Sequence, residues 1–195
     1  VKRRITVYPG AGATIKVDAD RTYTANAEIN QYDNNVLKFD LSAGNLTIGN
    51  IVEFNSNSNN RPIEVTGPGM LTLLNGITRY GSGADSLRVE KRGTGVLDVG
   101  TGSNWDREVT ITAGVLRGTL PTASVMNDVI LNGGVYESNG TFNMTLGTTA
   151  TQDVRWNGAA ASGGFSAYGG SHLIDFNTPG VRDGLVWGAT SGFVG

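Results

Sequence analysis

The sequence predicts an all-β solenoid, a parallel β-helix in which about three short strands make up each coil. Three observations carry this prediction. Apolar and polar residues alternate at period two between Gly-rich breaks, as they do in strands. A unit of this kind recurs every 20 to 26 residues, and no stretch repeats apolar residues at helical spacing over three turns. Gly accounts for 29 of the 195 residues, which suits a chain with many tight turns.

We expect residues 1–195 to form a single β-helix domain that is a fragment of a longer protein. Residues 1–35 alternate with weaker apolar anchors and are expected to form the first coils. Residues 36–150 hold the clearest repeats. Residues 151–195 are expected to continue the stack with larger interior side chains. The aromatic residues of this last part are Trp156, Phe165, Tyr168, Phe176, Trp187 and Phe193.

Each repeat in 36–150 has two apolar residues that flank one outward residue, then a Gly, then a second apolar run. The second apolar residue of each first strand should lie in one interior ladder, with steps of 26, 24, 22 and 20 residues. The members of this ladder are Phe39, Val65, Val89, Ile111 and Leu131. The Asn-rich segment 55–60 interrupts the pattern and is expected to be a loop that leaves the rod.

Outward positions of the repeats alternate in charge, which favours stacking in register. In the first strand these positions are Lys38, Glu64, Arg88 and Thr110. In the second strand they are Thr47, Thr72, Asp98, Arg117 and Glu137. Opposite charges at laterally adjacent positions stabilise a pair of strands by about 0.2–1 kcal/mol.

The stretch Val109–Gly118, of sequence VTITAGVLRG, resembles the passenger-associated repeat of autotransporter-type proteins, as does Lys91–Leu97. The Gly-rich stretch Trp156–Gly170 and Leu185–Gly188 are similar to segments of the large bacterial surface proteins that carry such repeats. The resemblance covers residues 60–195. It implies a right-handed β-helix, export across a Gram-negative-type envelope, and a location outside the cell or at its surface.

Composition excludes several classes of function. The chain has no Cys, so disulfides and thiolate metal sites are excluded. Its net charge is −2 and its basic residues do not cluster with aromatic residues, so nucleic acid is not an expected partner. No window of 18 apolar residues exists, and therefore no transmembrane segment is expected.

Carboxylates are candidate catalytic groups because many β-helices act on polysaccharides. Glu64, Asp98 and Glu137 lie on ladders beside cations or Thr, as in a solvated charge ladder, whereas a glycan-active site needs several carboxylates that converge. His172 is the only histidine and cannot form a two-His metal site, so we interpret it as a turn or surface residue. Asp18 and Asp20 lack the remaining ligands of a Ca²⁺ loop.

Other short motifs carry no chemistry of their own. Gly10–Gly12 and Gly100–Gly102 lack the third Gly or the Lys-Ser/Thr of phosphate loops and are interpreted as turns. Asn45, Asn139 and Asn143 lie in Asn-x-Thr sequons, which carry little meaning in a bacterial protein. The sequence thus predicts no catalytic, cofactor-binding or metal-binding residues and no cofactor. It leaves ligand-binding residues open.

Three functions stay open at this stage. The leading hypothesis is a non-catalytic structural module, such as a rod, a fibre or an adhesin stalk. The alternative is a β-helix that binds or cleaves polysaccharide, with surface glycans as partners. A third is a filament subunit that associates with itself or with neighbouring repeats of the same protein, because exposed strand edges seek partners.

Overall fold

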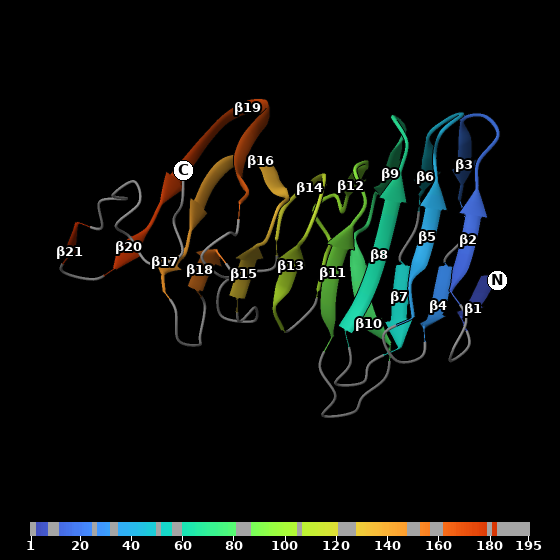
Figure 1. Ribbon diagram of the computed structural model, residues 1–195, viewed down its shortest axis with the longest axis horizontal. Coiled ribbons are helices and arrows are strands. Elements are labelled where there is room, and N and C mark those ends of the chain that lie inside the picture. Colours follow the sequence, from blue (N-terminus) through green and yellow to red (C-terminus); the bar gives the residue numbers. More distant parts are fainter. Residues whose placement is uncertain are drawn as a thin grey trace.

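The described part of the chain is built from parallel β-strands that lie side by side along one long axis (Figure 1). We describe a computed structural model, in which no helix occurs among the described residues. The predicted all-β class is therefore confirmed for that part of the chain. The described residues are 3–7, 12–24, 27–31, 35–49, 52–55, 60–80, 87–104, 107–120, 128–147, 153–156, 162–178 and 181–182.

Three parallel sheets contain all but two of the described strands. Sheet A has the order β1 (Arg3–Val7), β4 (Ala27–Gln31), β7 (Val52–Asn55), β10 (Ile77–Tyr80). Sheet B has the order β17 (Thr145–Leu146), β18 (Asp153–Trp156), β15 (Asp128–Leu131), β13 (Val109–Ile111), β11 (Arg88–Arg92), β8 (Asn60–Thr66), β5 (Leu37–Asp40), β2 (Ala13–Lys16). Sheet C has the order β19 (Gly164–Asp175), β16 (Val135–Asn143), β14 (Val115–Arg117), β12 (Val96–Asp98), β9 (Met70–Leu73), β6 (Leu46–Ile48), β3 (Arg21–Tyr23). The remaining strands, β20 (Asn177–Thr178) and β21 (Val181–Arg182), form an antiparallel pair.

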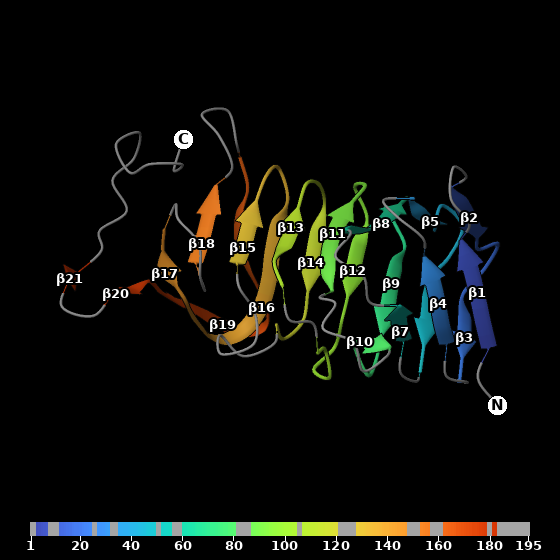
Figure 2. The same ribbon diagram turned by 90° about the horizontal axis from the view of Figure 1, so that it is seen from below.

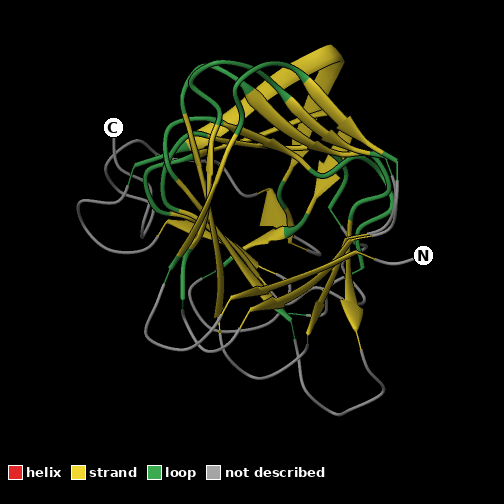
Figure 3. Cartoon of the chain, turned by 90° about the vertical axis from the view of Figure 1, so that its right-hand side faces the viewer, coloured by secondary structure: helices red, strands yellow, loops and turns green. Residues whose placement is uncertain are grey.

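The chain visits the three sheets in turn. From β1 to β12 the order is A, B, C without exception, and each strand up to β9 pairs in parallel with the strand three places later. Beyond β10, the described part of sheet A continues only as an isolated bridge between Thr78 and Asn104. Figure 2 shows the same succession from a second side, and Figure 3, along the long axis, shows strands on different sides of the molecule. This arrangement is solenoid-like.

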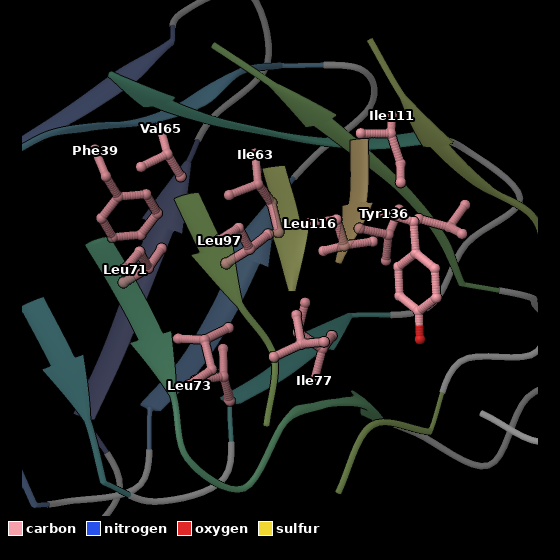
Figure 4. Packing of buried hydrophobic residues seen from close by; sticks show 14 of the residues in the cluster. Phe39, Ile63, Val65, Leu71, Leu73, Ile77, Leu97, Ile111, Leu116 and Tyr136 are labelled. Carbon is pink, nitrogen blue, oxygen red and sulfur yellow. The ribbon is translucent and has the colours of Figure 1, made fainter. Parts of the chain in front are cut away.

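One interior ladder runs along sheet C as the repeat pattern predicts. The register pairs each apolar anchor with the anchor of the next strand, in the order Leu46, Leu71, Leu97, Leu116, Tyr136, Phe165. All but Phe165 are buried, and Phe165 packs against the same cluster. Figure 4 shows Leu71, Leu97 and Leu116 in the cluster with Ile63 of sheet B, so the two sheets share one core.

The predicted interior ladder of sheet B is wrong at β11. Val65 follows Phe39 and Leu131 follows Ile111 as expected, but Val89 pairs with Arg61 and Val109 rather than with Val65 and Ile111. The residue of β11 beside Ile111 is Lys91, whose other neighbour is Ile63. The observed ladder is Leu37, Ile63, Lys91, Ile111, Leu131, Trp156.

The error is a slip of β11 by two residues against β13 and by four residues against β8. Because side chains alternate at period two, a shift by an even number of residues leaves the inward and outward faces unchanged, and burial alternation cannot detect it. The apolar pattern therefore assigns the interior position to Val89, although the structure gives it to Lys91. The turn after β11 is held against the end of β8, because the Gly95 amide donates a hydrogen bond to the Val65 carbonyl at 2.8 Å. This contact fits the observed register of β11 against β8.

Tight stacking of the turns between sheets B and C requires glycine. Gly114 has a φ of 64°, and a Cβ there would lie 2.5 Å from the carbonyl oxygens of Gly93 and Gly95. Near the N-terminal end the same stack uses polar side chains. Asp20 Oδ1 accepts bonds from the amide and side chain of Asn45, whose own Oδ1 accepts from the Met70 amide at 2.9 Å.

The two ends of the stack partly match the predictions. The described part of 1–35 contains four strands, and Val17 belongs to the core. Of the predicted loop 55–60, the described Asn55 and Asn60 are strand ends, and the rest lies outside the described residues. Trp156 is buried, and Phe165 and Phe176 pack against the core, as expected of interior aromatic residues. Tyr168 is half exposed and is the exception, while Trp187 and Phe193 lie outside the described residues.

Candidate functional site: a pocket on the outer face of sheet C

A row of polar side chains crosses the outer face of sheet C. The register places Thr72, Asp98, Arg117 and Glu137 at laterally adjacent positions, as the sequence predicts, and Ser166 follows them. Each of these residues follows an inward anchor directly, and therefore its side chain points away from the core. The row brings one cation between two carboxylates.

Arg117 and Glu137 form the tightest contact of the row. Arg117 Nε lies 2.5 Å from Glu137 Oε2, and the two side chains are only 15% and 13% exposed. Ser166 donates to the other carboxylate oxygen at 3.2 Å. Arg117 Nη1 lies 3.2 Å from the sulfur of Met70, a weak acceptor. Asp98 Oδ1 accepts from the Gly100 amide at 2.9 Å, which stabilises the turn after β12.

A large bulge in β19 covers this row. Ser138 pairs with Ala167, and Gly140 pairs with His172, so Asn139 alone lies opposite the four residues Tyr168–Ser171. The extra residues carry β19 out of the sheet plane, as β-bulges do. Gly169, at a φ of 69°, provides the turn directly after Tyr168. The Tyr168 ring consequently lies over Arg117, with its centroid 3.6 Å from the guanidinium carbon.

Together these elements enclose a shallow pocket of about 160 Å³. Asp98 and Arg117 lie at its base, and Tyr168 forms one wall. The remaining lining residues come from the segments after β12 and β14 and from β16, and are Gly100, Thr101, Gly118, Thr119, Ser138 and Asn139. Its lining offers hydroxyl, amide, carboxylate and guanidinium groups beside one half-exposed aromatic ring. The repeat pattern of the sequence does not reveal this pocket, because Tyr168 belongs to the bulge and has no equivalent in the other repeats.

The outer face of sheet B carries a second charge ladder, which differs from the expected one. Lys38 and Glu64 pair at 3.2 Å as predicted, but the neighbour of Glu64 on β11 is Arg92 rather than Arg88. Arg92 donates to both oxygens of Glu90, at 2.6 and 2.8 Å. These bonds raise the pKa of Arg92 above its ordinary value. Arg88 instead lies 3.7 Å from Glu108. The ladder is thus composed of paired charges.

His172 is neither a turn residue nor a free surface residue, which corrects our interpretation. It belongs to β19, and its ring packs against Tyr136, Phe142 and Phe165, with ring centroids 5.6–6.4 Å apart. Its Nδ1 donates to the Ser166 carbonyl at 2.8 Å. The buried Nε2 has no hydrogen-bond partner among the described residues. The bulge turns this side chain inward, and sequence alternation alone does not reveal that.

The remaining candidates have structural roles. Asp18 forms an exposed ion pair with Arg21 at 2.6 Å, while Asp20 bonds to Asn45. Gly100–Gly102 form a turn, and Gly100 has a φ of 57°. Gly12 is described, whereas residues 10 and 11 are not. Within the described ranges, no three His, Asp or Glu side chains come together in a way that could hold a metal ion.

Lys91 is a buried titratable group that the repeat pattern does not indicate. Its side chain is fully buried, and its Nζ donates to the carbonyls of Arg92, Gly93 and Ala113 at 2.7–3.1 Å. Burial lowers the pKa of Lys91 to about 8, against the opposing effect of the nearby Glu64 carboxylate. The Arg92 carbonyl ends β11, and those of Gly93 and Ala113 belong to the stacked turns between sheets B and C, so this ammonium joins two successive turns.

Comparisons with known proteins do not place the chain in a family. No protein-family model matches it, and no curated protein and no solved structure matches it. Among the described residues, no helix is long and apolar enough to cross a membrane.

Proposed function

We propose that the chain is a non-catalytic structural module of a secreted or cell-surface bacterial protein, and that its fold is a right-handed parallel β-helix with three strands per coil. The observation that supports this most is the unbroken pairing of parallel strands in sheets B and C over most of the described chain. Such a stack gives a stiff element whose length grows with each added coil. A rod, a fibre segment or an adhesin stalk needs that property.

The resemblance of Val109–Gly118 to the passenger-associated repeat supports a location outside the cell. This stretch spans β13, the following turn and β14, and its inward residues Ile111 and Leu116 belong to the two interior ladders. The motif therefore covers the sheet B and sheet C strands of one repeat. The absence of Cys from the sequence is compatible with this role, because stacked coils supply stability without disulfides.

The arrangement of carboxylates supports a non-catalytic role. Asp98 and Glu137 lie two strands apart, about 9.5 Å at the usual strand spacing. Arg117 occupies the position between them and pairs with Glu137, and only Asp98 lines the pocket, so the two carboxylates do not converge on one site. Glu64 is paired with Lys38.

Three experiments test the proposal. Small-angle X-ray scattering of the full chain should give the profile of a rod, and protease treatment of intact producing cells should digest the chain at the cell surface. A globular scattering profile, or complete protection in intact cells with digestion after lysis, would contradict the proposal. An assay for cleavage of a polysaccharide panel should show no turnover. Turnover that Asp98→Asn or Glu137→Gln abolishes would contradict the non-catalytic role.

A further inference from the structure

We propose that the pocket between Tyr168 and Asp98 on the outer face of sheet C binds one residue of a neutral saccharide. This goes beyond a purely structural role, since it gives the rod a ligand. The proposal rests on three features of the pocket, namely its aromatic wall, its charge balance and its hydrogen-bonding groups.

Tyr168 provides the apolar contact that a sugar ring needs. One face of its ring lies over the Arg117 guanidinium, yet the residue remains 50% exposed. A large aromatic residue left this exposed beside a pocket offers a rigid surface at small cost in conformational entropy. Tyr168 is the first residue of the bulge, in which β19 has three residues more than β16. The contact between the rings of Phe165 and His172 holds β19 on both sides of the bulge.

The charges of the pocket disfavour an anionic ligand. Of the residues that line the pocket, Asp98 and Arg117 carry charges of opposite sign, and Arg117 is already held at 2.5 Å by Glu137, which does not line the pocket. A phosphate, a sulfated glycan or a uronate would have to approach the Asp98 carboxylate, and the one guanidinium that lines the pocket is already paired with Glu137. Nucleic acid is disfavoured for the same reason, because its binding depends on phosphate neutralisation. A neutral polyol avoids this repulsion.

Hydrogen-bonding groups line the pocket in the mixture that hydroxyl groups require. Asp98 uses Oδ1 for the Gly100 amide, which leaves Oδ2 as an acceptor. Arg117 has five N–H donors, of which the described contacts engage one with Glu137 and one with the Met70 sulfur. Asn139, Ser138, Thr101 and Thr119 add groups that donate and accept. A few polar groups around one apolar surface are typical of small-ligand sites.

The size of the pocket limits the ligand to one ring in contact. A volume of about 160 Å³ equals roughly five water molecules at ~30 Å³ each. The pocket is shallow and open, so we expect a weak interaction, with a Kd of about 1 mM. Several such sites in a longer surface protein would bind a polysaccharide more tightly through multivalency.

The test is a titration of the full chain with a panel of oligosaccharides, followed by calorimetry or NMR chemical shifts. Neutral probes are maltotriose, cellotriose, mannotriose, xylotriose and N,N′,N″-triacetylchitotriose, and acidic probes are trigalacturonate and a heparin tetrasaccharide. At least one neutral probe should bind, and it should bind more tightly than the acidic probes. Failure of every neutral probe to bind, or tighter binding of an acidic probe, would overturn the proposal.

Variants locate the binding. Tyr168→Ala should weaken the affinity for the neutral probe about tenfold or more, and Tyr168→Phe should retain it. Tyr23→Ala is the matched control, because Tyr23 is similarly exposed but lies on β3, at the other end of sheet C. Asn139→Ala is a second variant at an exposed position and should weaken binding several-fold. Affinity unchanged in both Tyr168→Ala and Asn139→Ala, or lost equally in Tyr23→Ala, would overturn the proposal.

Discussion

Lys91 lies directly beside Ile111 in the interior ladder of sheet B, with its ammonium bonded to the last carbonyl of β11 and to two carbonyls of the adjoining turns. Its lateral neighbours, Ile63 and Ile111, are both buried and apolar. A charge at such a position costs free energy unless its donors are satisfied, and here all three N–H donors have acceptors. The ammonium thus links two successive coils through its hydrogen bonds. The free energy of keeping it protonated in the folded chain depends on pH.

Stability should rise with pH between about 8 and 10 because of Lys91. Its pKa is about 8 in the folded chain, whereas a solvated lysine of the unfolded chain has the ordinary pKa of 10.5. In this window the unfolded state binds the proton and the folded state does not, so the free energy of unfolding increases with pH. The increase should be about 1.6 kcal/mol from pH 8 to 9.5, because the folded-state lysine is still half protonated at pH 8 and the slope reaches about 1.36 kcal/mol per pH unit only above that.

Chemical denaturation of the parent protein and of Lys91→Met at several pH values measures this effect. The rise should be absent in Lys91→Met and present in Lys38→Met, which changes an outward lysine of the same sheet. Above pH 10 the raised pKa of Tyr136, caused mainly by burial, opposes the trend, because the unfolded state then loses the tyrosine proton first. Equal pH profiles for the parent and Lys91→Met would contradict the interpretation.

A second lysine beside Lys91 should prevent the surrounding coils from folding. Ile111 is completely buried and pairs laterally with Lys91 and Leu131. Ile111→Lys would bury an ammonium without a partner, at a cost of several kcal/mol. Thr110→Lys is the matched control, since Thr110 is the adjacent outward residue and lies beside Glu90.

Circular dichroism melts of the two variants check this expectation. They should show a loss of about 4 kcal/mol or more for Ile111→Lys and a change within about 0.5 kcal/mol for Thr110→Lys. Similar melts for the two variants would exclude the register of β13 in sheet B.

The sequence predicts sheet C better than sheet B for a geometric reason. In sheet C each anchor follows its turn glycine by two residues, as in Gly44 and Leu46 or Gly95 and Leu97. Alignment by the glycines and alignment by the anchors therefore predict the same register. In sheet B the number of residues between the apolar anchor and the following glycine varies. An alignment by apolar residues therefore places Val89 beside Ile111, where the structure has Lys91. A buried lysine has no apolar signature, and therefore the repeat pattern does not place Lys91 in the ladder.

The repeat pattern cannot predict the pocket, because the pocket depends on an irregularity. The charge row of Asp98, Arg117 and Glu137 follows from the register, and its prediction is confirmed. The aromatic-rich segment predicts an interior position for Tyr168, but Tyr168 lies three residues after the inward Phe165, so alternation places it on the outer face, where the bulge begins. The sequence signal for the bulge is the pair Gly169–Gly170, because glycine weakens a strand at that point.

Gly114→Ala should destabilise the stacked turns. Gly114 has a positive φ, and an added Cβ would meet the carbonyl oxygens of Gly93 and Gly95 at 2.5 Å. Both features penalise a side chain, so we expect a loss of at least about 2 kcal/mol in urea unfolding. Gly164→Ala should change stability by less than about 0.5 kcal/mol, because a Cβ at that position meets open space. An equal loss in both variants would show that turn stacking does not limit these positions.

The ion pair between Arg117 and Glu137 should contribute more to stability than the one between Lys38 and Glu64. In the first pair the side chains are 15% and 13% exposed and lie 2.5 Å apart, whereas in the second they are 39% and 28% exposed at 3.2 Å. Solvent screens the more exposed pair, and pairs of that kind typically contribute less than about 1 kcal/mol. Hydrogen bonds between charged groups with little solvent access contribute about 1.5–3 kcal/mol.

Two double-mutant cycles measure the difference, one with Arg117→Met and Glu137→Gln and one with Lys38→Met and Glu64→Gln. The coupling energy should be about 1.5 kcal/mol or more in the first cycle and below about 0.5 kcal/mol in the second. Raising the NaCl concentration from about 0.1 to 1 M should reduce the second value further and leave most of the first, because the Debye length shortens to about 3 Å and acts mainly on exposed charges. A first coupling energy that vanishes in high salt would show that Arg117 and Glu137 are solvated in solution, and the base of the saccharide pocket would then lack a fixed geometry.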